Sequence, residues 1–163
     1  LVDIISKNGN MLLSVPQRGD GTIDDKEEAI LEDIAAWMSI NKESVFDTRP
    51  WKVFGEGPVA ETSNPLHAQG FNEGNHPPYT SEDIRFVAKE DVLFAHVLAW
   101  PVDNKVIIKS LSKENSLHSQ EIENVELLGI DKPLKYTQTN NGLEIELPSE
   151  GEANDISFVL KIS

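Results

Sequence analysis

The sequence predicts a mainly β protein, an antiparallel β-sandwich of about eight strands preceded by an orphan βα unit. From Trp51 onward, apolar residues recur with period two in short runs separated by turn residues, which is typical of a sandwich. Before Trp51, one apolar run leads into an amphipathic helix, as in a parallel sheet covered by helices, and no second unit of this kind follows. We therefore expect residues 1–50 to be the end of a larger α/β domain and residues 51–163 to be a complete β-sandwich domain.

The first fifty residues predict two helices with a short strand between them. Residues 1–9 place four apolar side chains on one side of a short helix. Residues 12–15 predict a buried strand, closed by Pro16 because proline cannot extend a central ladder. Thr22 is a candidate N-cap for the second helix, which we expect to end near Asn41. Large apolar side chains recur in this helix with the helical period: Ile30, Leu31, Ile34, Trp37 and Met38.

The rest of the sequence predicts the strands of the sandwich. The first covers residues 52–59, and a long polar loop follows at 60–78. The other predicted strands cover residues 84–88, 92–100, 105–110, 125–128, 134–139, 143–147 and 156–162. Residues typical of turns separate them, among them Asn-Asn-Gly at 140–142.

The composition excludes several classes of partner and site. With 28 acidic and 14 basic residues, the net charge of −14 argues against binding to nucleic acid or anionic lipid, because both require Lys and Arg to neutralise phosphate. The chain has no Cys, so it has no disulfide framework and no thiolate metal site. No apolar run approaches the roughly 20 residues of a membrane-spanning helix. The chain begins with Leu-Val-Asp rather than Met, and we expect it to be a fragment.

Several motifs resemble those of the α-L-fucosidase family of glycoside hydrolases. The run LVDIISKNGNMLLSVP at residues 1–16 is similar to the end of the family's catalytic barrel, which commonly reads LVD-(V/I)-VSK-x-GNxLLN-(V/I)-xP. The resemblance continues in family order through six further runs: DGTI at 20–23, INKESVF at 40–46, TRPW at 48–51, YTSEDIRF at 79–86, LAWP at 98–101 and VELLG at 125–129. GLEIELP at 142–148 completes it, so the resemblance covers nearly the whole chain.

The resemblance implies a (β/α)8-like catalytic barrel followed by a C-terminal β-sandwich, with the orphan βα unit at the end of the barrel. It implies an exo-enzyme that hydrolyses terminal α-L-fucose from glycans with retention, using an Asp nucleophile and a carboxylic acid/base, without a cofactor. In the family both catalytic residues lie upstream of the position of Leu1. We therefore expect no catalytic residue in this chain, no activity of the chain by itself, and a parent that is periplasmic or secreted if bacterial, or lysosomal otherwise.

Met11 is the one candidate for contact with the substrate. The family often carries an apolar or aromatic residue after its Gly-Asn pair, near the face of the barrel where active sites form. The fucose C6 methyl group needs an apolar neighbour, which a methionine can supply. Packing inside the barrel is the alternative role for Met11, because flexible Met side chains fill irregular gaps.

For the other candidate functional residues, a structural role is the interpretation that the sequence favours. Gly9-Asn10 and Asp20-Gly21 are typical of turns. The four histidines at 67, 76, 96 and 118 show no ligand spacing, so we expect no metal site, and we expect His96 to be a half-buried strand residue. Residues 82–85 (EDIR) predict an internal Arg–carboxylate pair. Five aromatic residues are either core residues or sugar-stacking residues: Trp51, Phe71, Tyr79, Trp100 and Tyr136.

Two further expectations concern partners. A carbohydrate-binding sandwich, which would tether an enzyme to glycans, is the alternative function, and it requires a row of exposed aromatic side chains. Without the missing barrel, the apolar stripe of the second helix would be left in water at a cost of about 1.5–3 kcal/mol per side chain. We therefore expect it to cover a face of the sandwich or the same segment of a second copy, giving a possible homo-oligomer.

Overall fold

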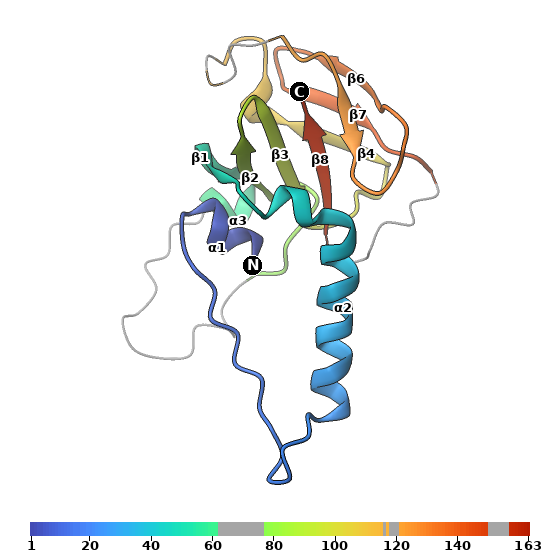
Figure 1. Ribbon diagram of the computed structural model, residues 1–163. Coiled ribbons are helices and arrows are strands. Elements are labelled where there is room, and N and C mark those ends of the chain that lie inside the picture. Colours follow the sequence, from blue (N-terminus) through green and yellow to red (C-terminus); the bar gives the residue numbers. More distant parts are fainter. Residues whose placement is uncertain (62–76, 116, 118–120, 150–156) are drawn as a thin grey trace.

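The protein consists of two antiparallel sheets packed face to face, with two helices on the outer side of the larger sheet (Figure 1). This computed structural model describes residues 1–61, 77–115, 117, 121–149 and 157–163. The larger sheet has the strand order β1-β2-β3-β8-β5: Arg49–Glu56, Ile84–Lys89, Val92–Val97, Phe158–Ile162 and Val125–Leu127. The smaller sheet has the order β4-β7-β6: Lys105–Ile108, Leu143–Glu146 and Lys135–Gln138. The predicted antiparallel sandwich of eight strands is confirmed.

The main core lies between the two sheets and follows from the period of two along each strand. In β2, Ile84 and Phe86 point into this core, whereas Arg85 and Val87 point to the opposite face. The smaller sheet contributes alternate residues in the same way, such as Leu143 and Ile145 of β7. Each strand therefore buries its apolar set by twofold alternation, which is why the strands could be read from the sequence.

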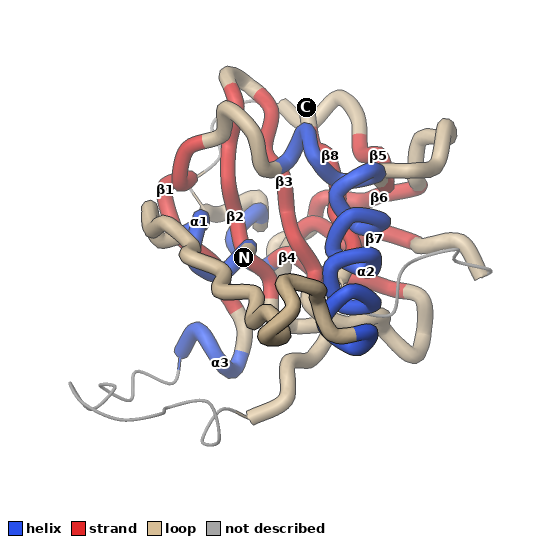
Figure 2. Tube along the Cα trace, turned by 60° about the horizontal axis from the view of Figure 1, so that its bottom comes forward, coloured by secondary structure: helices blue, strands red, loops and turns tan. Residues whose placement is uncertain are grey.

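The outer face of the larger sheet is covered by the two N-terminal helices, α1 (Val2–Ser6) and α2 (Asp25–Asn41). Figure 2 shows both helices on this side, α1 near β1 and β2 and α2 in front of β8. A second cluster of buried residues lies between α2 and the sheet: Trp37, Val87, Phe94 and Val159. The larger sheet is thus buried on both faces, which explains the nearly continuous apolar runs of β3 and β8.

The strand boundaries differ from the predicted ones by a few residues. β1 begins at Arg49 and ends at Glu56, three residues before its predicted end, because the short helix α3 (Pro58–Glu61) follows. β3 ends at Val97, and β4 ends at Ile108, where a turn of 3-10 helix, η3 (Lys109–Leu111), begins. Most of the predicted loop at 60–78 lies outside the described residues.

The predicted strand at residues 12–15 is wrong for this structure. These residues form no ladder with any strand of the described residues, and the Leu12 side chain is 97% exposed. The physical reason is that a strand is defined by its neighbours, and no parallel neighbour accompanies residues 12–15. An isolated bridge between Gln17 and Ile23 is the first pairing after α1.

The helix α2 ends at Asn41 as predicted, but its N-cap is Asp24 rather than Thr22. The Asp24 carboxylate accepts a hydrogen bond from the backbone N–H of Lys26 at 3.0 Å. Thr22 is not available as a cap because its own N–H and hydroxyl donate to the Asp20 carboxylate, at 3.0 and 2.7 Å. Asp20 thereby closes the predicted turn, in which Gly21 takes a φ of +89°.

Gly57 is expected to tolerate no side chain. Its φ is +106°, and a Cβ atom there would collide with the carbonyl oxygen of Glu82. Replacing Gly57 by alanine should therefore lower the free energy of unfolding by about 1–3 kcal/mol. Gly19→Ala is the matched control, because a Cβ there meets nothing within 4 Å, and it should change stability by less than about 0.5 kcal/mol. Urea denaturation of both variants measures the difference, and equal stabilities would contradict the expectation.

Candidate functional site

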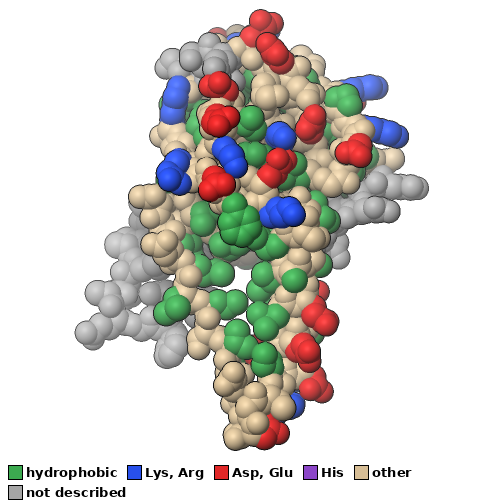
Figure 3. Space-filling model, viewed as in Figure 1, with side chains coloured by type: hydrophobic (Ala, Val, Ile, Leu, Met, Phe, Trp, Pro, Cys, Tyr) green, Lys and Arg blue, Asp and Glu red, His purple; other side chains and the backbone are tan. Residues whose placement is uncertain are grey.

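Residues 9–41 form an arm that projects away from the sandwich, consisting of the irregular segment before Ile23 and the helix α2 (Figure 1). Its tip is held by Arg18, whose guanidinium pairs with Asp24 and Asp25 at 2.9 and 3.4 Å. Figure 3 shows hydrophobic side chains along the two sides of the arm. The residues of this apolar arm surface are Met11, Leu12, Leu13 and Ile30, which are exposed, and Leu31 and Ile34, which are partly exposed.

Met11, the predicted substrate contact, lies on this surface with 41% of its area exposed. It is not packed into the core of the sandwich, and its two predicted roles, contact with the substrate and packing inside the barrel, both stay predictions. The helical stripe of α2 is used only at its C-terminal end, where Trp37 is buried against the sheet and Met38 is partly buried. The remainder of the stripe does not cover a face of the sandwich, and a second copy as its partner stays a prediction.

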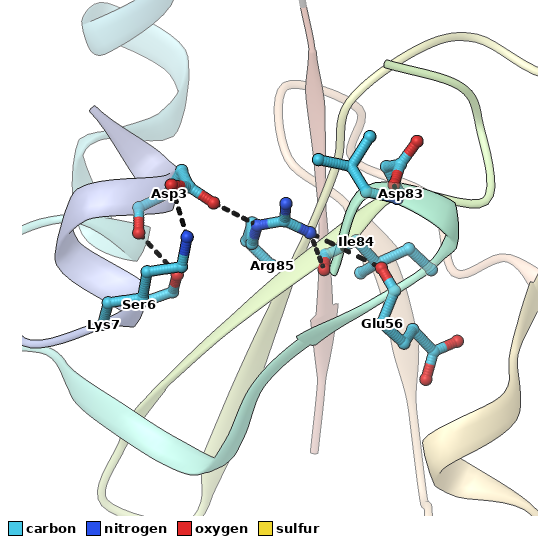
Figure 4. Close-up of polar contacts among 8 residues, drawn as sticks. Asp3, Ser6, Lys7, Glu56, Asp83, Ile84 and Arg85 are labelled. Atoms are coloured by element: carbon cyan, nitrogen blue, oxygen red, sulfur yellow. Dashed lines mark hydrogen bonds and ion pairs between the residues drawn. The ribbon is translucent and has the colours of Figure 1, made fainter. Parts of the chain in front are cut away.

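The arm is connected to the sandwich by α1, which is tied to the larger sheet through a buried arginine. Arg85 of β2 is 1% exposed, and its Nε donates to Oδ1 of Asp3 at 2.5 Å (Figure 4). Its Nη1 donates to the carbonyl of Ile84 at 3.0 Å. Asp3 also accepts from Lys7 at 2.8 Å, one helical turn further on. The guanidinium lies 5.6 Å from the centre of the Phe54 ring.

These contacts set the charge state of the Asp3 carboxyl group. Burial alone would raise its pKa, but hydrogen bonds from Lys7 and Arg85, together with their positive charges, hold the pKa of Asp3 below its ordinary value of 3.8. Asp3 is therefore ionised at neutral pH and neutralises Arg85. The prediction that Arg85 pairs with a carboxylate within residues 82–85 is wrong, because its partner is Asp3. Asp83 points away from Arg85 (Figure 4) and accepts hydrogen bonds from the backbone N–H groups of Val59 and Thr80.

His96 is fully buried in β3, rather than half-buried as expected. Its ring stacks on Trp37 of α2, with 6.1 Å between the ring centroids. Neither ring nitrogen has a hydrogen-bond partner among the residues that the structure describes. His67, His76 and His118 lie outside those residues, and within the described part of the chain no group of three His, Asp or Glu side chains could hold a metal ion.

Three of the five aromatic candidates belong to the main core. Trp51, Trp100 and Tyr136 all pack against it, and the Tyr136 hydroxyl donates to the carbonyl of Ile122 at 2.9 Å. Tyr79 is exposed, at 39%, with its ring 5.7 Å from the Arg85 guanidinium, and Phe71 lies outside the described residues.

A shallow groove of about 370 Å³ crosses the solvent-facing side of the smaller sheet. Its outward side chains are mixed in charge, with Glu146 of β7 standing between Lys105 of β4 and Lys135 of β6 in the register of the strands. Ile107 is the apolar side chain that this face exposes, at 47%. Tyr136, which also lines the groove, is partly buried, so the described part of the groove lacks a row of exposed aromatic side chains on which sugar rings stack.

The sequence did not indicate two of these contacts. Arg85 and His96 lie within apolar strands on the face that the helices cover, so a polar residue inside a nearly continuous apolar run was the available signal. Their partners, Asp3 and Trp37, lie 82 and 59 residues earlier in the chain, and no local sequence pattern links them.

In the part of the chain that the structure describes, no helix is long and apolar enough to cross a membrane.

Comparisons with known proteins agree with the motifs. The model of the family "Alpha-L-fucosidase" matches residues 1–43, and that of the "Alpha-L-fucosidase C-terminal domain" matches residues 78–163. Residues 44–77 belong to neither match, so the division of the chain at residues 50 and 51 stays a prediction.

Individual relatives give the same result. Plasma alpha-L-fucosidase of Rattus norvegicus is 26% identical over 151 residues, and tissue alpha-L-fucosidase of Homo sapiens is 27% identical over 149 residues; each match covers 91% of this chain. The chain spans only 27% and 26% of the lengths of these two relatives.

Solved structures show the same fold. The Thermotoga maritima alpha-fucosidase is similar to 99% of this chain with a TM-score of 0.72 and 24% identity, and the match covers 32% of that protein. Alpha-L-fucosidase isoenzyme 1 of Paenibacillus thiaminolyticus has a TM-score of 0.68 and 19% identity. The chain belongs to the alpha-L-fucosidase family, whose C-terminal domain lies in its residues 78–163.

Proposed function

We propose that this chain is the C-terminal part of a retaining exo-α-L-fucosidase, which hydrolyses terminal α-L-fucose from glycans. The observation that carries the proposal is the pair of family matches, one on each side of residues 44–77 and in the order of the family. The relatives named above are fucosidases, and one Thermotoga maritima structure holds fucose. The periplasmic, secreted or lysosomal location expected from the family is part of the same proposal.

The titratable groups support the view that the reacting carboxyl groups belong to a part of the enzyme outside this chain. Retaining glycosidases use two carboxyl groups about 5–5.5 Å apart, and the acid/base needs a raised pKa. Among the described carboxyl groups, the two with a resolved shift are Asp3 and Asp20, and hydrogen bonds to each carboxylate lower its pKa. Neither is suited to donate a proton near neutral pH.

The apolar arm surface supports a location beside the rest of the catalytic domain. Exposed apolar side chains gathered on one surface mark an interface rather than a solvent face. The arm lies within the segment that matches the family model "Alpha-L-fucosidase". In the proposed enzyme, this surface packs against the preceding part of the catalytic domain, and Met11 lies at the substrate pocket.

The sandwich has a structural role in this proposal rather than a sugar-binding one. Trp51, Trp100 and Tyr136 are partly buried and pack against the core, so they do not form a row of exposed rings for stacking on sugar. The groove on the smaller sheet is lined by charged side chains of both signs and by Ile107. Both observations favour a domain whose contribution is to hold α1 and α2 in place.

Activity measurements test the proposal. We expect the reading frame upstream of Leu1 to encode a βα-repeating domain of about 300 residues with a strand-end Asp. The whole protein should hydrolyse an aryl α-L-fucoside and release the α-anomer first, which NMR detects. The chain of 163 residues by itself should show only background turnover, because in this proposal both catalytic carboxyl groups belong to the preceding part of the catalytic domain.

Two outcomes would overturn the proposal. One is an upstream reading frame without such a domain. The other is turnover by the purified chain that disappears when one of its own acidic residues is changed, for example Glu144→Gln in the groove of the smaller sheet. A matched control is Glu61→Gln, on an exposed residue of α3 far from the groove in the chain.

A further inference from the structure

The contact between α2 and the larger sheet is built around a buried histidine. The helix-facing side of the sheet carries alternate residues of its three central strands: Arg85 and Val87 of β2, Phe94 and His96 of β3, and Val159 and Lys161 of β8. His96 lies in the middle strand of this face and is 0% exposed. Its ring stacks on Trp37 with an interplanar angle of 27°, and Trp37 Nε1 donates to the carbonyl of Ser157 at 2.9 Å.

The environment of His96 is suited to a neutral ring and not to a charged one. Both ring nitrogens are buried without a hydrogen-bond partner among the described residues. A neutral imidazole can remain in such a site, and a contact with the backbone of Ser44 serves at most one of its nitrogens. An imidazolium would bring a positive charge and at least one unsatisfied N–H donor into it. The stacked indole of Trp37 and the strands on either side leave the ring no direct access to water.

The charged groups around His96 add to this cost. Arg85 stands directly opposite His96 in the β2–β3 register, and its positive charge is already compensated by Asp3 of α1. Asp3 is further engaged by Lys7 of the same helix. From β8, Lys161 pairs with Glu43 of η1 (Lys42–Ser44) at 3.3 Å. The nearby acids are therefore each occupied by another cation, and the amino group of Leu1 adds a further positive charge.

We propose that the contact between α2 and the larger sheet is a pH-dependent latch, in which protonation of His96 releases Trp37 and α2 from the sheet. When α2 moves away, the ring of His96 becomes hydrated and can carry its proton. The latch connects the segment matched by the family model "Alpha-L-fucosidase" with that matched by the C-terminal domain. It is a property of the chain itself, and it does not depend on the proposed hydrolase activity.

The direction of the effect follows from the pKa of His96 in the two states. Burial lowers the pKa of His96 from 6.5 to about 4 in the docked state, and the backbone of Ser44 counters this only in part. The released state binds the proton more tightly. The equilibrium constant for docking of α2 on the larger sheet is therefore at its full value above pH 6.5 and decreases as the pH falls toward 4. Each pH unit in this range lowers the docking equilibrium constant about tenfold, and the whole range lowers it by roughly 300-fold.

Hydrogen exchange and NMR of the intact chain test the latch. After correction for intrinsic rates, the protection of the α2 amides should fall about tenfold per pH unit between 6.5 and 4, while the amides of β3 and β8 keep theirs. The Trp37 indole N–H signal should weaken over the same range. The indole of Trp100, which donates to Asn104 at 2.9 Å within the sandwich, is the internal control.

Two variants separate His96 from the other titrating groups. His96→Phe keeps an aromatic ring against Trp37 but cannot be protonated, so α2 protection should become independent of pH between 6.5 and 4. The triple variant H67Q/H76Q/H118Q keeps His96 and should behave as the parent chain. Acetylation of the Leu1 amino group should leave the dependence in place, because burial is its larger cause.

The outcomes that overturn the latch are equally direct. If His96→Phe retains the parent chain's loss of α2 protection, another group is responsible. If His96→Phe does not fold, the ring of His96 can be titrated by NMR in the parent chain. Protonation of that ring near pH 6.5 with the Trp37 signal unchanged would show that the site accepts the charge, and the proposal would then be wrong.

Discussion

Replacing Phe86 by alanine is expected to lower the free energy of unfolding by about 3–5 kcal/mol. Phe86 is fully buried in the main core, at the centre of β2. Its ring meets the Trp51 ring of β1 edge-on, with 5.2 Å between the centroids. Alanine would remove this aromatic pair and leave a cavity between two sheets that cannot move together without breaking their ladders.

The matched control for Phe86 is Phe46→Ala, because the Phe46 side chain is 59% exposed and should contribute less than about 1 kcal/mol. A loss of about 3–5 kcal/mol approaches the whole stability of a typical domain, so a milder variant accompanies Phe86→Ala. Phe86→Leu keeps most of the apolar volume and should lose about 1–2 kcal/mol. Urea denaturation followed by circular dichroism compares the three variants, and a cost for Phe86→Ala no larger than that for Phe46→Ala would contradict the expectation.

Removal of the Asp3 carboxylate is expected to cost about 3 kcal/mol, because it leaves the buried Arg85 guanidinium without a counter-charge. Losing one partner of a fully buried pair costs roughly 3–5 kcal/mol. Asp3 is about one-third exposed, so water screens part of the interaction and the lower end applies. Asp3→Ala should therefore destabilise the chain strongly, whereas Asp33→Ala, at an exposed position of α2, should change stability by less than about 0.5 kcal/mol.

The double variant D3A/R85M distinguishes an unpaired charge from lost packing. Methionine replaces the buried guanidinium by an apolar chain of similar length, so the double variant should be more stable than Asp3→Ala. The coupling energy from the double-mutant cycle should exceed about 1 kcal/mol. Additive effects of the two substitutions would show that the ion pair contributes nothing beyond its separate contacts.

The same pair predicts a pH dependence that is separate from the latch at His96. The pKa of Asp3 is lowered in the folded chain, so its contribution to stability is complete above the ordinary value of 3.8 and is lost as the pH falls below it. Urea denaturation at pH 5 and at pH 3 should therefore differ more for the parent chain than for Asp3→Ala. The absence of such a difference would show that Arg85 does not depend on Asp3 for its charge compensation.

Local patterns were sufficient for most of the fold. The period of two predicted every strand of both sheets, because each strand buries one side chain in two against the core. The helical period and the acidic first turn predicted α2 as far as Asn41. These features depend on residues within one element, and the motifs that resemble the α-L-fucosidase family are local in the same way.

The cap of α2 and the strand at 12–15 were predicted wrongly for physical reasons that differ. Thr22 has the chemistry of an N-cap, but it is used within the turn that Asp20 closes, and Asp24 caps the helix. Residues 12–15 have the apolar pattern of a buried strand, but no strand among the described residues lies beside them to form a ladder. Thr22 therefore has the propensity to cap a helix, and residues 12–15 have the propensity to form a strand. A competing hydrogen bond in the first case, and the lack of a partner strand among the described residues in the second, prevented the predicted structure.

The sequence by itself determined the elements of this protein, their antiparallel character and the family to which it belongs. Only the tertiary structure decided how five strands and three strands divide into two sheets, because pairings such as β3 with β8 join residues that no local pattern relates. It also decided that Arg85 pairs with Asp3 and that the ring of His96 is buried against Trp37. These contacts arise from the burial of one sheet face by distant helices, and burial is what changes the charge and the energy of a polar group.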